Sequence, residues 1–166
     1  MKPLDWIYRL SRWILGAVFI VAGGSKLLEP VIFATLIDAY GIVPDPLLMP
    51  VAIGMPAIEV IAGIGLIFDL KGSLSVIAVL LVLFMAILGY GIQMGLDVDC
   101  GCFGPGDPEA KAFHGLRTAL GRDLLMMLGI AFVAGWRRYR RIEPVWITQV
   151  INGNGSKRRR ADNAYV

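Results

Sequence analysis

The feature that most constrains this chain is a run from residue 72 to residue 96 that contains no charged side chain. About 20 apolar residues in a helix cross the ~30 Å hydrocarbon layer of a membrane. In that layer backbone polar groups must bond to one another, which a helix achieves within a single segment. The run therefore predicts a membrane-spanning helix. A composition of 57% hydrophobic and 17% charged residues agrees, because an ordinary soluble domain carries more charge.

Three further apolar runs predict three more spans. The second covers residues 50–68 and is interrupted only by Glu59, whereas the first and fourth are uncharged only over residues 13–25 and 124–136. Those two reach full length if they begin near residues 4 and 116. We therefore predict an all-α fold, an integral membrane bundle of four transmembrane helices.

Charged residues then fall within the two extended spans. Arg9 and Arg12 would snorkel from the first span to the inner surface, and Arg122 and Asp123 would lie inside the membrane in the fourth. Small residues in segments 17–23, 54–58 and 63–67 have spacings that suit close helix packing. We therefore interpret these small residues as contacts between packed helices.

Two segments outside the spans carry helix signals. Residues 31–40 place apolar side chains at helical spacing, with Gly41 as a stop and Pro44 beyond, which predicts a short helix at the outer face. Asp107, Pro108 and Glu109 have the pattern of a helix start, so the segment that contains the cysteines should end at a helix N-terminus.

The chain reads as one domain followed by a tail. We expect a four-helix domain over residues 1–136 and a basic, disordered cytoplasmic tail over residues 137–166. The first apolar run lacks a small-residue cleavage site, so we expect it to be retained. Basic tails beside a span usually set topology and contact anionic lipid, so we expect a lipid bilayer as partner and no nucleic acid.

The basic residues predict the orientation. With four spans both termini lie on one side, and 12 of the 16 lysines and arginines fall on that side. The positive-inside rule places the termini and the turn at residues 69–73 in the cytoplasm. The expected location is thus the inner (plasma) membrane, with the segment after the third span facing the periplasm or the cell exterior.

That outer segment holds both cysteines of the chain, Cys100 and Cys102, separated by one glycine. A disulfide that encloses one residue removes little entropy from the unfolded chain, so it would not act as a staple. A close pair can instead alternate between a dithiol and a strained disulfide, and the outer side is where disulfides persist. Two other interpretations stay open, namely half of a metal site and two unremarkable thiols.

The metal interpretation needs more ligands. His114, Asp99, Met94 or Asp107 could supplement the sulfurs, and a soft Cu(I) ion could accept fewer than four ligands. We assign no metal ligands on this basis. His114 is the only histidine, and it could also carry protons for the cysteines, although a lone histidine in a polar segment more often does neither.

Glu59 falls in the middle of the second span, where a carboxylate is costly and should face the bundle interior. Arg122 and Asp123 lie at membrane depth and could partner it. Lys26, near the outer end of the first span, could join them, but a snorkelling lysine is the interpretation we prefer. The cluster either has a function or is a buried ion pair that sets helix register.

The ensemble of fragments resembles the MauE/DoxX family of redox-associated membrane proteins. The resemblance runs from about residue 12 to residue 136, and the Cys-Gly-Cys-Phe-Gly element points to the MauE branch. Its fragments are residues 12–19, 22–27, 40–44, 56–59, 99–104 and 122–125. It implies a four-helix membrane bundle that works in thiol–disulfide metabolism alongside a thioredoxin-like partner, most directly through Cys100 and Cys102. For Lys26, Glu59 and Arg122 it implies a shared feature without a defined role.

The resulting hypothesis is a membrane thiol–disulfide redox protein, a thiol–disulfide oxidoreductase if it turns over. Cys100 and Cys102 would exchange electrons with a thioredoxin-like or client protein on the outer side. A second partner or a membrane quinone would then reset the pair, with Glu59, Arg122 and Asp123 moving protons or orienting that carrier. The alternatives are a soft-metal-binding or transport protein that uses the same thiols, and an assembly factor that does not turn over.

Overall fold

The described part of the chain is entirely helical. In the computed structural model, residues 3–95 and 116–140 are described, and the fold consists of α1 (Pro3–Leu28), α2 (Pro30–Ala39), α3 (Asp45–Ile67), α4 (Ser73–Met94) and α6 (Leu116–Tyr139). Within those residues α1, α3, α4 and α6 are long and apolar enough to cross a membrane, and α2 is a shorter apolar helix. The prediction of an all-α bundle of four spans with a short extra helix is confirmed.

Local chemistry sets the helix ends. Pro44 precedes α3 in an extended conformation, and Asp45 with a proline in the first turn starts the helix five residues before the predicted residue 50. Gly95 ends α4 with a left-handed backbone, at a φ of 67°, so the helix is slightly shorter than the apolar run. The spans are therefore located by hydropathy, but their ends are set by caps.

Most of the apolar surface of the long helices points outward. Ile61, Val79 and Leu125 are 69%, 67% and 70% exposed, and only 22–33% of the most apolar windows of the four long helices is buried inside the molecule. A soluble bundle buries such side chains, because exposed apolar area in water is unfavourable. Lipid is the environment in which this surface is stable, so the chain is a multi-pass membrane protein.

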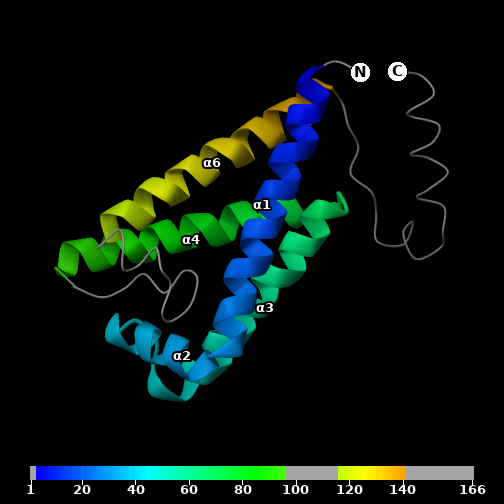
Figure 1. Cartoon of the computed structure of the whole chain (residues 1–166). Coiled ribbons are helices and arrows are strands. Elements are labelled where there is room, and N and C mark those ends of the chain that lie inside the picture. The colour runs from blue at the N-terminus through cyan, green and yellow to red at the C-terminus, as the bar shows by residue number, and fades with distance from the viewer. Residues whose placement is uncertain (1–2, 96–115, 141–166) are drawn as a thin grey trace.

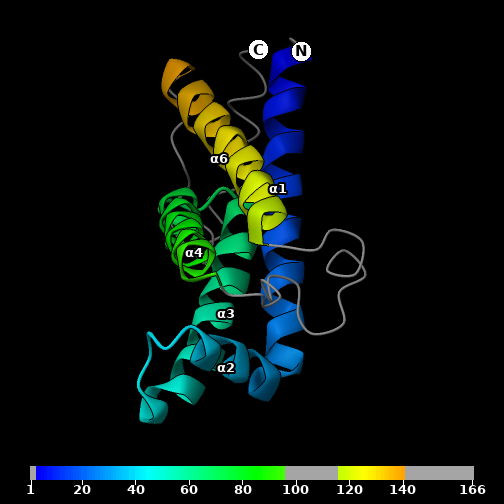
Figure 2. The same ribbon diagram turned by 90° about the vertical axis from the view of Figure 1, so that its left-hand side faces the viewer.

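The helices form two pairs that diverge. α1 packs along α3, and α4 packs along α6, as Figure 1 shows. The N-terminus of α1 and the C-terminus of α6 lie at one end of the molecule, whereas α2 lies at the opposite end (Figures 1 and 2). We call the first of these the terminal end and the second the α2 end.

Glycines allow the backbones of α1 and α3 to approach closely. A Cβ atom added at Gly16 would lie 2.9 Å from the carbonyl oxygen of Gly63, and one added at Gly23 would lie 2.7 Å from that of Pro56. Either distance is shorter than the normal contact of a Cβ atom, so this interface requires glycine at both positions. By contrast Gly54 has open space around it and makes no such contact.

The main core joins all four long helices near the terminal end. Tyr8, Leu15 and Phe19 from α1 meet α3, α4 and α6 there; the other buried members are Ala62, Leu66, Leu74, Ile77, Leu80, Leu81, Ile130 and Val133. A smaller cluster of Tyr40, Leu88 and Ala119 joins the far ends of α4 and α6. Charged residues occupy the region between these apolar layers.

Candidate functional site

Part of the predicted site lies outside the described residues. Cys100, Cys102 and His114 belong to it, as does the helix start at residues 107–109. The structure does describe the flanking helix ends. α4 leaves the turn at the terminal end and finishes at Met94, and its last turns pack with the start of α6 through Leu88 and Ala119. The two helix ends between which the cysteines lie in the sequence, Met94 of α4 and Leu116 of α6, are thus remote from the terminal end (Figure 1).

Lys26 and Glu59 form a buried ion pair between α1 and α3. The ammonium nitrogen lies 2.9 Å from one carboxylate oxygen of Glu59 and 3.0 Å from the other, so it donates to both. The two side chains are only 3% and 1% exposed. The preferred interpretation of Lys26 as a snorkelling lysine is therefore wrong. Lys26 lies two residues before the end of α1, and its ammonium is bound by a carboxylate of α3 inside the molecule.

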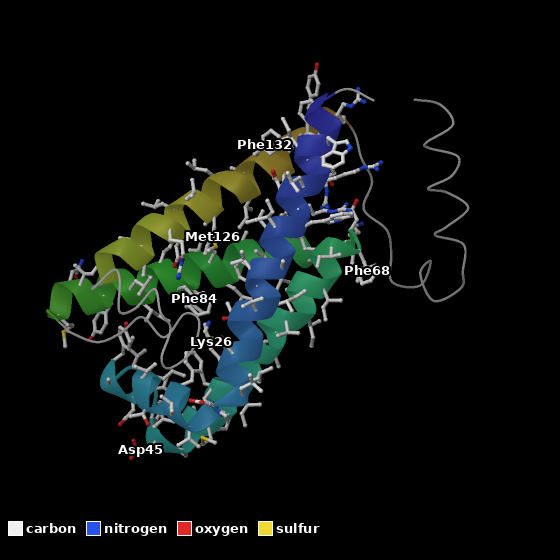
Figure 3. All side chains as sticks on the ribbon, in the orientation of Figure 1. Lys26, Asp45, Phe68, Phe84, Met126 and Phe132 are labelled. Carbon is white, nitrogen blue, oxygen red and sulfur yellow. The ribbon has the colours of Figure 1, made fainter. Side chains whose placement is uncertain are left out.

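Aromatic rings complete the surroundings of Lys26. Its ammonium nitrogen is 4.5 Å from the ring centre of Phe84 on α4 and 5.3 Å from that of Phe33 on α2. The negative faces of such rings attract a cation, most strongly where water is excluded. Figure 3 shows Lys26 and Phe84 next to one another between α1 and α4. One side chain of α1 thus contacts α2, α3 and α4.

Arg122 and Asp123 of α6 border the same region. A small cavity of about 30 Å³, measured as the space open to the centre of a water molecule, has Lys26, Glu59, Arg122 and Asp123 in its wall. Apolar side chains supply the rest of the lining: Val18, Phe19, Ala22, Leu81, Phe84 and Met126. A space of this size has room for about one water molecule beside the four charged side chains. The structure thus brings together four of the residues singled out in the sequence.

The pairing within this cluster differs from the expected one. Glu59 is bound by Lys26, whereas the carboxylate of Asp123 has its neighbour Arg122 at 3.5 Å. Asp123 is only 3% exposed, but the side chain of Arg122 is 25% exposed. The cluster therefore contains one closed ion pair and one looser pair that reaches the surface. We call Lys26, Glu59, Arg122 and Asp123 the charge cluster.

A second charged network, which sequence reasoning missed, lies at the terminal end. Arg12 of α1 contacts one carboxylate oxygen of Asp69 at 2.6 Å, and Arg137 of α6 donates to the other. Arg12 also donates to the carbonyl oxygen of Ile67 at 3.3 Å. Arg12 is 7% exposed, so the prediction that it snorkels to the inner surface is wrong. The network ties α1 and α6 to the α3–α4 turn.

The backbone at Asp69 explains how one acid reaches two arginines. Asp69 has a φ of 62°, the left-handed conformation that aspartate tolerates better than most residues. Its carboxylate is 12% exposed and is shared by Arg12 and Arg137. The sequence held one signal for this role, since Asp69 is an acid in a short turn on the side where most basic residues gather.

Among residues 3–95 and 116–140, no three histidine, cysteine, aspartate or glutamate side chains come together in a way that could hold a metal ion. The donors in the charge cluster are two carboxylates that already face cations. The chemistry available to such groups in a largely apolar cavity is hydrogen bonding and proton exchange.

Comparison with known proteins gives one match. The family model described as "Methylamine utilisation protein MauE" matches residues 4–137, which is most of the chain and overlaps every helix described above. No curated protein and no solved structure compared with the chain matches it.

Proposed function

We propose, from the premise that this chain belongs to the MauE family, that the protein is a membrane thiol–disulfide redox protein. Cys100 and Cys102 are its reactive groups, and they exchange electrons with a thioredoxin-like or client protein on the outer side. The observation that carries the proposal is a Cys-Gly-Cys pair in the sequence of a MauE family member, between the end of α4 at Met94 and the start of α6 at Leu116.

The chemistry is exchange between thiols and a disulfide. A thiolate of one protein attacks one sulfur of the other protein's disulfide, and a mixed disulfide forms as the second sulfur leaves as a thiolate. A second thiolate then resolves the mixed disulfide. Two electrons and two protons pass from the dithiol that is oxidised to the disulfide that is reduced. Because the chain has one cysteine pair, a second thiol–disulfide protein or a membrane quinone must return the pair to its starting state.

The basic residues support the orientation that this chemistry needs. Arg12 and Arg137 meet at the terminal end, and Lys71 lies in the turn that α3 and α4 share there. Positive residues favour the cytoplasmic side, so the termini are cytoplasmic and the cysteines face the periplasm or the cell exterior. That is the compartment in which a disulfide persists.

The other residues predicted for the site can assist the thiol chemistry of the cysteines. His114 follows them in the same segment and can accept a proton from an attacking thiol. The charge cluster provides polar groups among the membrane-spanning helices, where a proton or the head group of a quinone could be bound. The next subsection assigns a role to one member of that cluster.

Trapping of mixed disulfides tests the proposal. Each of the variants Cys100→Ser and Cys102→Ser, expressed as the full chain in membranes, leaves one thiol that cannot complete the exchange. We expect one of them to accumulate a covalent adduct with a thioredoxin-like or client protein that reductant releases, and the double variant to accumulate none. Thiol labelling of the unaltered chain should show a reversible two-electron titration.

Two results would contradict the redox proposal. One is stoichiometric copper or zinc held through both sulfurs in protein purified without chelator, with no exchange with a dithiol protein, which is the metal-binding alternative. The other is full function in the double serine variant, which is the assembly-factor alternative. Oxidation of the reduced pair by a quinone analogue, measured in the same preparation, separates a quinone from a protein as the resetting partner.

A further inference from the structure

We infer that the cavity at the charge cluster is a proton-exchange site, in which Asp123 gains and loses the proton while Glu59 remains the fixed partner of Lys26. The site is built wholly from described residues of α1, α3, α4 and α6. Its use in thiol chemistry rests on the proposed function, but the proton exchange itself does not.

Glu59 is unsuited to exchange because Lys26 holds it from both oxygens. A proton on that carboxylate would leave the ammonium of Lys26, which is 3% exposed, with the two aromatic rings and no anion beside it. An unpaired charge in such surroundings is strongly disfavoured. The Lys26–Glu59 pair therefore stays ionised and holds a constant field at the cavity wall.

Asp123 is in the opposite situation. Its carboxylate borders the cavity and is approached by Arg122 at 3.5 Å, longer than a normal hydrogen bond between ionised groups. If Asp123 takes a proton, the cation that loses this anion is Arg122, which has a further contact and whose side chain is 25% exposed. Neutralising Asp123 thus leaves no fully buried cation without an anion.

The charged groups that face Asp123 come from three helices. Lys26 of α1 and Glu59 of α3 lie across the cavity, and Arg122 adjoins it on α6. α4 contributes Leu81 and Phe84 to the wall and contains no charged residue at all. With all four groups ionised the cluster is neutral, so one proton changes its charge by one unit.

The packing of the helices favours one direction for proton access. The cavity has room for about one water molecule. Toward the terminal end the four long helices pack through the main core, in which Leu66, Ile77 and Val133 have no exposed surface. We therefore expect protons to reach the cavity past Arg122, whose side chain is 25% exposed, and not through the core.

The step is a simple proton transfer without movement of electrons. A thiol that becomes a thiolate gives its proton to water, and water in the cavity passes a proton to the Asp123 carboxylate, which becomes the neutral acid; the reverse step returns it. Asp123 is seven residues into α6, about 10 Å along the axis from the helix start at Leu116. The carboxylate therefore belongs to the part of α6 about two helical turns from its start.

Infrared difference spectroscopy of the full chain in lipid, recorded while the pH is changed, tests the inference. We expect a band from a protonated carboxyl group that shifts when the protein is grown on aspartate labelled with ¹³C at its side-chain carboxyl. The band should vanish in Asp123→Asn, move in Asp123→Glu and persist in Glu59→Gln. The isotope-labelling measurement uses the unaltered chain, so it does not depend on the folding of any variant. If Asp123→Asn does not fold, Asp123→Glu retains the carboxylate and serves as the second variant.

The outcomes are distinguishable from those of the redox test. A band that is insensitive to aspartate labelling, or that vanishes in Glu59→Gln and survives in Asp123→Asn, would overturn the inference. Absence of any carboxyl band over the pH range in which the protein is stable would overturn it as well. The same spectra in the double variant Cys100→Ser/Cys102→Ser should keep the band, so loss of thiol exchange and loss of proton exchange are separate results.

Discussion

At the scale of single residues, Lys26 is the charged side chain of α1 that contacts α2, α3 and α4. A lysine near the end of a span can reach the interface along its own flexible stem, or it can bond inside the bundle. In this molecule Glu59 lies across the α1–α3 contact with its oxygens 2.9 and 3.0 Å from the ammonium. Two charges buried together are tolerable, whereas either one alone is not.

The ion pair predicts a specific pattern of stabilities. Lys26→Met should lower the free energy of unfolding by about 3–5 kcal/mol, because the Glu59 carboxylate is left buried without its cation. The double variant Lys26→Met/Glu59→Leu should recover much of that loss. Unfolding in mixed detergent micelles, with the two single variants and the double variant, measures the coupling.

The control for this cycle is Lys71→Met, which replaces an exposed lysine in the α3–α4 turn. Exposed charge contacts contribute about 0–1 kcal/mol, so this variant should change stability little. If Lys26→Met were as mild as Lys71→Met, the buried pair would not be the dominant contact of Lys26.

At the scale of helices, the contact between α1 and α3 positions the charge cluster. Gly16, Gly23 and Gly63 let the two backbones meet, and a Cβ atom at Gly23 would also lie 3.0 Å from the Cβ atom of Glu59. The separation of these helices therefore sets the distance between Lys26 and Glu59. Packing and charge are coupled at one place in the sequence.

Two adjacent glycines of α1 provide a matched test. Gly23→Ala places a methyl group 2.7 Å from the backbone oxygen of Pro56, whereas Gly24→Ala meets no atom within 4 Å. We expect Gly23→Ala to destabilise the protein by about 1–3 kcal/mol through overpacking. Gly24→Ala should be neutral or stabilising by up to about 1 kcal/mol, because alanine favours a helix over glycine.

Thermal unfolding followed by circular dichroism in detergent compares these two variants under identical conditions. Equal effects of the two substitutions would mean that α1 is rotated about its axis relative to the arrangement in Figure 1. That rotation would also remove Lys26 from Glu59, so the result bears on the site as well as on the helix.

At the scale of the whole molecule, the distribution of charge distinguishes the two ends. The terminal end contains the network of Arg12, Asp69 and Arg137, and the α2 end carries a short apolar helix that packs on α3 through Phe33, Ala34 and Ala52. A bundle with such a difference has one favoured orientation in a membrane. The location of the cysteines relative to the membrane follows from it.

Labelling of single cysteines in intact cells tests that orientation. In the background Cys100→Ser/Cys102→Ser, we place one reporter at an exposed position of α2, Asp38→Cys, and another in the α3–α4 turn, Lys71→Cys. A membrane-impermeant maleimide should label Asp38→Cys in intact cells and Lys71→Cys only after permeabilisation. The reverse pattern would put the cysteines of the natural chain in the cytoplasm, where disulfides seldom persist.

The sequence by itself determined the number of spans, the all-helical fold, the short helix after α1 and the intramembrane charges at Glu59, Arg122 and Asp123, whereas it favoured the wrong environment for Lys26. These follow from local properties: a long apolar run must be helical in lipid, and a charge within such a run is conspicuous wherever its neighbours lie. The ends of the spans were predicted less well, because a helix continues past its apolar run until a cap such as Pro44 or Gly95 ends it.

Only the tertiary structure decided which charges meet. Glu59 pairs with Lys26 rather than with Arg122, and Asp69 binds Arg12 and Arg137, because α1 lies against α3 at one rotation and α6 reaches the α3–α4 turn. The rotation of a helix about its axis depends on packing with helices that are distant in the chain. In lipid an apolar side chain that faces outward carries no energetic penalty, so the apolar pattern of the sequence does not show which face of a helix is buried in the bundle. The choice between Gly23 and Gly24 as the contact, and between Lys26 and Arg122 as the partner, therefore lies in the assembled bundle and not in any segment of the sequence.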